Sequence, residues 1–199
     1  AGLLFALEFV CIYVGMLYTS ASRLTILLYT SPLWVALLLP LWLKHERLRV
    51  HQWLGLGIAF SGVAFALRDS LSSGGSWLGD ALSLAAGAMW GLTTVVLRTT
   101  ALSRVSAEKL LFYQVGVSAL LLPLVAVGMG ETFTLDYSVW GWSSLLVQAS
   151  LGAFVTFLIW MWIISHYPAT RVSAFSFLSP LSALMFGAWW LGEPVTVDL

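Results

Sequence analysis

Residues 21–43, ASRLTILLYTSPLWVALLLPLWL, return at 169–191 as ATRVSAFSFLSPLSALMFGAWWL, at a constant offset of 148 residues. Leucine and alanine matches are expected by chance in so apolar a chain, but arginine, proline and tryptophan matches in one ungapped register are not. The matching residues are Ala21, Arg23, Ser31, Pro32, Leu33, Trp42 and Leu43, which fall on Ala169, Arg171, Ser179, Pro180, Leu181, Trp190 and Leu191. We therefore predict an internal repeat. The alternative is that two unrelated apolar helices each carry a Ser-Pro kink.

The composition indicates whether water or lipid surrounds this chain. Of its 199 residues, 60% are apolar and 9% are charged, and the mean hydropathy is +0.93. Too few polar side chains exist to cover a water-soluble globule, so we predict a membrane protein. Nine basic and nine acidic residues cancel, and no basic field indicates nucleic acid as a partner. Cys11 and the three histidines show no ligand spacing, so we expect no metal and no other cofactor.

Seven apolar runs of about 20 residues predict transmembrane helices. They cover residues 1–19, 25–43, 52–67, 78–97, 107–129, 140–165 and 172–191. Gly55, Gly57 and Gly62 in the short third run predict a face for close helix packing. The sequence thus predicts an all-α membrane protein, a polytopic bundle of about seven transmembrane helices in the lipid bilayer.

Basic residues in the connections orient these helices, because Lys and Arg are retained on the cytoplasmic side. One side collects seven of them and the other side two, Arg23 and Arg68. The seven are Lys44, Arg47, Arg49, Arg98, Arg104, Lys109 and Arg171. We therefore expect loops 44–51 and 98–106 in the cytoplasm, and loops 68–77 and 130–139 outside.

The orientation also bears on the repeat. Arg23 and Arg171 are repeat mates, and their helices lie five spans apart, an odd number, so the two arginines emerge on opposite faces. The repeat is predicted to be inverted in topology, which is how many carriers are built. On this logic the mate of span 78–97 would lie upstream of Ala1 and the mate of span 52–67 after Leu199.

The chain is therefore expected to be seven spans of a ten-span, 5+5 inverted-repeat transporter fold. Residues 1–69 would be three helices that end the first repeat, and 70–77 the linker. Residues 78–199 would be four helices of the second repeat, without its last helix. Ala1 already lies inside an apolar run, so we expect neither a signal peptide nor a natural start there.

Seven short stretches, taken in order, resemble the EamA family of the drug/metabolite transporter superfamily. They are YTSASRL (18–24), YTSPL (29–33), GD (79–80), MWG (89–91), YPATR (167–171), FLSPL (177–181) and LGEPVT (191–196). The resemblance implies a bacterial-type ten-helix permease built from two five-helix units. It also implies a central cavity between the two bundles and, as in many members, outward transport.

Three polar residues interrupt the apolar runs. Glu8 is predicted to face a cavity or a partner and to bind a proton or a cationic substrate, because a carboxylate in hydrocarbon is costly. The alternative is that Glu8 lies near the cytoplasmic interface. Gln114 and Gln148 also need inward hydrogen-bond partners. Pairing between helices is the favoured explanation for both, although a position in the substrate cavity is open.

The repeated prolines give the main prediction for a substrate site. Each proline removes a backbone donor, so both helices should be kinked at matching depth. In carriers such broken helices face a site near the midplane, although a kink that only improves packing is the alternative. The predicted cavity residues are Tyr29, Ser31, Pro32, Phe177, Ser179 and Pro180, with Trp90 and Trp160 as cavity walls because these two tryptophans lie well inside spans.

These observations favour a secondary transporter, an exporter or permease, of a small metabolite or amino-acid-like compound. It would work by alternating access in the plasma (inner) membrane, with protons as a candidate coupling ion. The alternative is a truncated, non-transporting membrane fragment or scaffold. An intramembrane enzyme is disfavoured, because the sequence has no GxSxG, no HExxH and no histidine inside a span.

Overall fold

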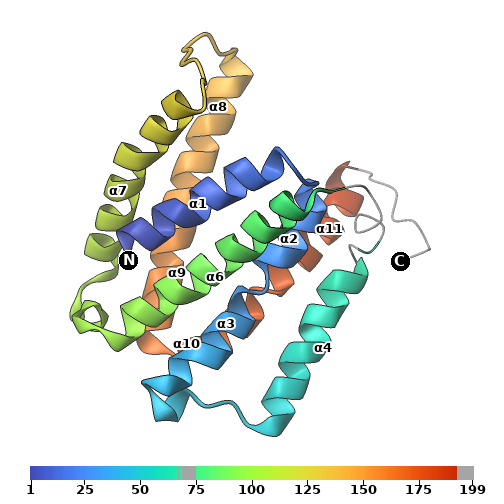
Figure 1. The fold of residues 1–199 in the computed structure, drawn as a ribbon, viewed down its shortest axis with the longest axis vertical. Coiled ribbons are helices and arrows are strands. Elements are labelled where there is room, and N and C mark those ends of the chain that lie inside the picture. Colours follow the sequence, from blue (N-terminus) through green and yellow to red (C-terminus); the bar gives the residue numbers. More distant parts are fainter. Residues whose placement is uncertain (67, 69–74, 192–199) are drawn as a thin grey trace.

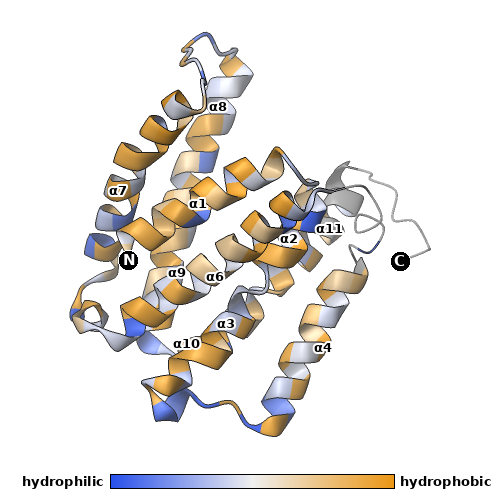
Figure 2. Cartoon of the chain, in the orientation of Figure 1, coloured by the Kyte–Doolittle hydropathy of each residue, from blue (hydrophilic) through white to orange (hydrophobic). Residues whose placement is uncertain are grey.

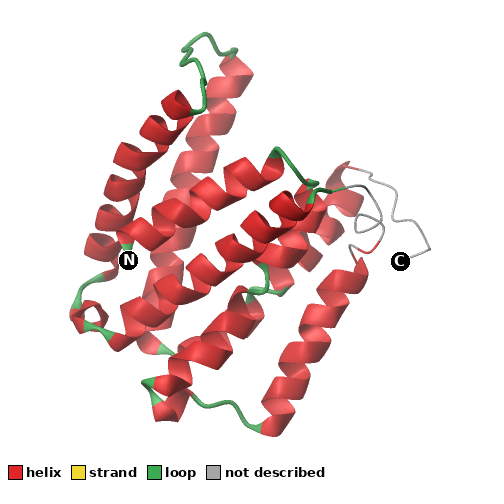
Figure 3. Cartoon of the chain, viewed as in Figure 1, coloured by secondary structure: helices red, strands yellow, loops and turns green. Residues whose placement is uncertain are grey.

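The computed structural model describes residues 1–66, 68 and 75–191, and within that part every regular element is a helix (Figure 3). The longer helices are α1 (Gly2–Met16), α2 (Ala21–Leu28), α3 (Ser31–Leu38), α4 (Val50–Ala66), α6 (Trp77–Thr99), α7 (Ala107–Gly128), α8 (Val139–Val147), α9 (Thr156–His166), α10 (Ala169–Phe175) and α11 (Leu178–Leu191). Short 3-10 turns are η1 (Leu39–Leu41), η2 (Lys44–Glu46) and η3 (Ala101–Arg104), and η4 (Gln148–Val155) is π-helical. The predicted all-α fold is confirmed. Most of the predicted linker 70–77 lies outside the described residues, and the division into 1–69 and 78–199 stays a prediction.

Among the described residues, four helical segments are long and apolar enough to cross a membrane. They are Ala21–Leu41, Trp77–Thr99, Ala107–Gly128 and Val139–His166, and the apolar helices Gly2–Met16 and Val50–Phe65 are shorter. Large apolar side chains such as Leu120 and Leu146 are exposed, and apolar residues dominate the helices while polar ones gather toward the loops (Figure 2). Lipid explains this pattern, since water would not tolerate so much exposed apolar surface.

Helix α6 lies between two neighbours, with α1 along one side and the α2–α3 segment along the other (Figure 1). Glycines on α6 make this approach possible. A Cβ atom at Gly87 would lie 2.8 Å from the backbone oxygens of Leu27 and Leu28, and one at Gly91 would lie 2.6 Å from the Trp34 Cβ. A residue without a side chain is needed at both positions.

The glycines that the sequence analysis placed on a packing face lie on α4. A Cβ atom at Gly55, Gly57 or Gly62 would meet nothing within 4 Å, so that prediction is wrong for contacts within the part of the chain that the structure describes. Small-residue spacing indicates that a helix face can be approached closely, but it does not say which helix has a neighbour there. Close-packed glycines lie instead on α6 and at the start of α1, where a Cβ atom at Gly2 would lie 2.8 Å from Val117 Cγ2.

Both repeat helices are broken just ahead of their prolines. Helix α2 ends at Leu28 and α3 begins at Ser31, while α10 ends at Phe175 and α11 begins at Leu178. Proline has no N–H, and its ring crowds the carbonyl four residues earlier, so neither helix continues straight through its Ser-Pro pair. The seventh predicted span, 172–191, is therefore two helices, and the breaks match within one residue in the repeat.

An ion pair joins the starts of α2 and α6 at one end of the bundle. Arg23 Nε donates to Asp80 Oδ1 over 2.7 Å and Arg23 Nη2 donates to Asp80 Oδ2 over 2.5 Å, which makes the pair bidentate. The Ser76 N–H also donates to the Tyr18 carbonyl over 2.9 Å. Loop 20–24 and the described part of loop 68–77 therefore lie at the same end, as the predicted topology requires.

A buried carboxylate joins four elements at the opposite end. Glu46 accepts from Arg98 Nη2 (3.1 Å), from the Thr170 hydroxyl (2.7 Å) and from the backbone N–H groups of Ala169 (3.0 Å) and Thr170 (3.2 Å). Arg98 also donates to the Ile164 carbonyl over 2.8 Å. Burial alone would raise the pKa of Glu46, but the hydrogen bonds, led by those from Thr170, hold it below its ordinary value of 4.5.

Candidate functional site

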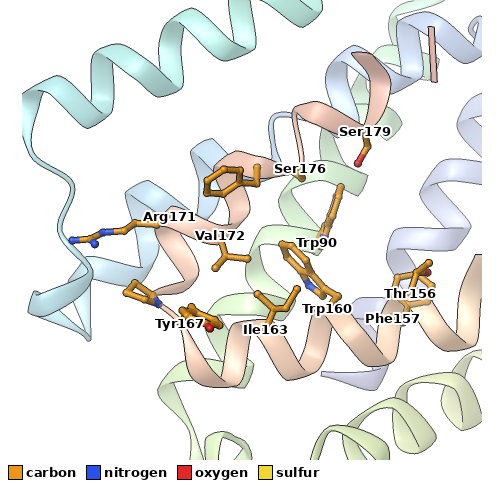
Figure 4. A pocket seen from close by; sticks show the side chains of 12 residues that line it. Trp90, Thr156, Phe157, Trp160, Ile163, Tyr167, Arg171, Val172, Ser176 and Ser179 are labelled. Carbon is orange, nitrogen blue, oxygen red and sulfur yellow. The ribbon is translucent and has the colours of Figure 1, made fainter. Parts of the chain in front are cut away.

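A pocket of about 700 Å³ lies beside the break between α10 and α11. Its walls come from α6, from α9, from α10 and from the first turn of α11, as Figure 4 shows. The residues that line it are Trp90, Thr156, Phe157, Trp160, Ile163, Tyr167, Pro168, Arg171, Val172, Phe175, Ser176 and Ser179. This volume suits a small organic molecule.

Four aromatic residues predicted for the cavity lie together in the structure. The ring centroids of Trp90 and Trp160 are 6.2 Å apart, and those of Tyr29 and Trp90 are 5.8 Å apart. The Phe177 ring lies 6.5 Å from that of Tyr29. The first two pairs pack edge to face and the third is tilted, and such packing holds large side chains in fixed orientations. The aromatic cluster thus links the break in α2–α3 to the wall of the pocket.

The two Ser-Pro pairs differ in what surrounds them. Ser31 and Pro32 are buried in the core, whereas Ser179 is exposed and lines the pocket, and Pro180 is buried behind it. The Tyr29 side chain interacts with the side chain of Ser179. The structure therefore brings the two breaks into contact, but only the second of them opens directly onto the pocket.

Glu8 and Gln114 lie inside the bundle and outside the pocket lining. Glu8 is 5% exposed and Gln114 is 1% exposed. Glu8 Oε2 and both polar side-chain atoms of Gln114 have no hydrogen-bond partner within the described residues. The helix-to-helix pairing favoured for Gln114 is therefore not formed there. Such atoms are costly in hydrocarbon, so each is a candidate for binding a proton or a polar ligand.

Gln148 is not brought into the site. Its side chain is exposed at the start of η4, and no contact in the described chain connects it with the pocket. The π-helical turn that begins here was not predicted. A wider turn changes which residues share a face, and the Gln148 side chain is exposed rather than directed toward an inward partner.

One buried polar group, the carboxylate of Glu46, was not identified from the sequence. Glu46 was not singled out, because it lies in the short polar connection 44–51 and nothing in its local sequence distinguishes it. Its partners are 52 and 124 residues away in the chain, so no local pattern reveals them. Among the described residues, no group of three His, Cys, Asp or Glu side chains is placed to hold a metal ion.

Comparison with known proteins identifies the family. The sequence model of the EamA-like transporter family matches residues 1–68 and 77–198. Two transporters of Bacillus subtilis strain 168, YoaV and YvbV, are 24% and 25% identical to this chain over 93% and 94% of its length. A transporter of Archaeoglobus fulgidus is 25% identical over 96% of the chain. All three are described as uncharacterized transporters.

The chain spans 63%, 60% and 64% of the lengths of these three relatives. A protein of known crystal structure superposes with a TM-score of 0.75 at 20% identity, and the match covers 98% of this chain and 69% of that one. This likeness supports the all-helical fold. The family match extends over nearly all of the sequence, and on that evidence the chain belongs to the EamA-like transporter family.

Proposed function

We propose that the protein is a secondary transporter that moves a small metabolite across the plasma (inner) membrane. The observation that carries this proposal is the pocket beside the α10–α11 break. Trp90 and Trp160 form part of its wall, and Ser179 of the second Ser-Pro pair lies in it. In carriers, broken helices of a repeat adjoin the substrate site. Substrate would bind there and be released by rearrangement of the two bundles, with export as the direction that the family suggests.

The coupling ion is proposed from the buried acid. Glu8 lies in α1, whose Phe5 and Phe9 contact Phe157 of the pocket wall, with ring centroids 5.3 Å and 6.4 Å apart. Its Oε2 has no partner in the described chain. Intramembrane acids of this kind mark proton or ion pathways. We therefore propose that Glu8 exchanges a proton during transport while the substrate occupies the neighbouring pocket.

Transport by the complete protein in liposomes tests the proposal. Vesicles loaded with amino acids, organic acids and aromatic acids are sampled by mass spectrometry for compounds that leave faster than from protein-free vesicles. Trp160→Ala should slow the flux about tenfold, because an aromatic wall of the pocket is lost. Trp140, which is 85% exposed at the start of α8, provides the control variant Trp140→Ala.

The outcomes separate transport from the alternatives. Flux that depends on Trp160 and not on Trp140 supports a transporter with this site. Equal flux in both variants places the site elsewhere. A protein that moves no compound above the protein-free rate is a scaffold or a fragment rather than a carrier.

A further inference from the structure

The pocket that we propose as the substrate site has an unusual lining. Five of the residues that form it are aromatic: Trp90, Phe157, Trp160, Tyr167 and Phe175. They come from α6, from α9 with the turn after it, and from α10, and Figure 4 shows the two tryptophans facing the middle of the site. Such surfaces suit a flat ring system, because stacked and edge-to-face contacts add to the burial of apolar area.

The formal charge on the pocket lining is positive. Arg171 is the only Lys, Arg, Asp or Glu among the lining residues. Its guanidinium has no hydrogen-bond or ion-pair partner within the described residues, in contrast to its repeat mate Arg23. Arg171 lies at the end of the pocket near Tyr167, with its side chain extending away from the two tryptophans (Figure 4). A cation placed there attracts anions toward the mouth of the pocket.

No lining group compensates a positive charge on a ligand. The nearby carboxylate of Glu46 already accepts four hydrogen bonds, from Arg98, Ala169 and Thr170, and Glu8 lies outside the lining. Aromatic faces attract cations, but an uncompensated arginine at the mouth repels them. A ligand ammonium group would therefore lose its hydration without gaining a carboxylate partner.

We propose that this site takes a planar aromatic organic anion, with a ring held by the tryptophans and a carboxylate attracted by Arg171. This inference rests on the proposed function and names its substrate class. The proposed substrate is an aromatic acid without an ammonium group, rather than the amino-acid-like compound expected from the sequence. Ser176 and Ser179 supply hydroxyl groups in the same lining.

Four ligands with one ring and different charges test the proposal: indole-3-acetate (anion), tryptophan (zwitterion), indole (neutral) and tryptamine (cation). Equilibrium binding is measured on the complete protein in lipid nanodiscs. We expect indole-3-acetate to bind at least tenfold more tightly than the other three, with an affinity that falls as salt increases. Arg171→Gln should weaken its binding about tenfold and leave indole unchanged. Arg104, an exposed cation in η3, gives the control Arg104→Gln, which should change neither.

Each outcome of these measurements either supports or overturns a stated part of the proposal. Equal or tighter binding of tryptamine or tryptophan overturns the proposal, and so does an Arg171→Gln variant that binds indole-3-acetate normally. If none of the four ligands binds while other compounds show Trp160-dependent flux, the anion assignment falls and the transport function stands. If indole-3-acetate binds through Arg171 but never crosses the liposome membrane, the site assignment stands and the transport function falls.

Discussion

The two segments of the repeat, residues 21–43 and 169–191, are related in sequence but have different surroundings. With the residues next to them, 20–46 and 168–191, they are called the first and second arm. The first arm is held at both ends, by Arg23 with Asp80 and by Glu46 with Arg98. The start of the second arm is held by the same carboxylate, because Glu46 accepts from two N–H groups of α10. Within the described residues, Arg171 has no partner and Ser179 is exposed to the pocket.

The difference shows that neighbours decide what a repeated segment does. Glycines of α6 let that helix press against the first break, so its Ser-Pro pair is part of the core. The second break faces a pocket, so its polar groups are available to a ligand. Under the proposed function, the first arm would serve as a fixed wall and the second would supply the groups that recognise the substrate.

The largest expected effect comes from Glu46, which both arms share. Glu46→Ala leaves Arg98 without its carboxylate and the start of α10 without its acceptor. Removing one partner of a buried ion pair costs about 3–5 kcal/mol. The free energy of unfolding, measured by SDS titration with tryptophan fluorescence, should fall by at least about 3 kcal/mol.

Glu131 supplies the control for this variant, since it is exposed in the loop after α7. Glu131→Ala should leave the free energy of unfolding within about 0.5 kcal/mol of the wild type. If Glu46→Ala also leaves the free energy of unfolding unchanged, the carboxylate does not stabilise the contact between the two arms. The comparison of the two arms would then lack this shared interaction.

A smaller effect is expected from the glycines that fix the first arm. Gly87→Ala places a Cβ atom 2.8 Å from two backbone oxygens of α2, and such overpacking costs about 1–3 kcal/mol. Gly57→Ala on α4 meets nothing within 4 Å, so it should be neutral or stabilise by up to about 1 kcal/mol through helix propensity. The same SDS titration measures both variants.

The matched pair of glycine variants also checks the correction made for α4. Destabilisation by Gly57→Ala would mean that α4 packs closely against a segment outside the described residues. A neutral Gly87→Ala would mean that α2 and α6 separate easily, and the first arm would not be a fixed wall.

The smallest effect on folding stability is expected from a change in pH. The pKa of Glu46 is lowered below 4.5 in the folded protein, so its contribution to stability is fully present above about 4.5 and is lost as pH falls through the lowered value. The stability difference between wild type and Glu46→Gln should therefore be constant from about pH 8 to about pH 5 and shrink only in stronger acid. A difference that shrinks between pH 7 and pH 5 would contradict the depressed pKa.

Local chemistry decided which of these features the sequence could predict. The two breaks follow from the missing N–H of Pro32 and Pro180, and the helical bundle follows from long uncharged runs, so both were predictable. Glu46 was not, because its burial depends on donors brought together only by the fold. Gln148 was expected to face an inward partner, but its side chain is exposed at the start of a π-helical turn that no local sequence pattern predicts.

The pairing of charges at the two ends of α6 has an electrical consequence. Arg23 with Asp80 and Arg98 with Glu46 are each neutral overall, so moving either pair as a unit through a membrane potential costs no electrical work. An unpaired charge such as that of Arg171 would feel about 2.3 kcal/mol for each 100 mV it crosses. An anion on Arg171 cancels that charge. The empty carrier would then respond to voltage during its conformational change, whereas in the loaded carrier this charge would be neutralised and voltage would act only through the proton that Glu8 is proposed to exchange.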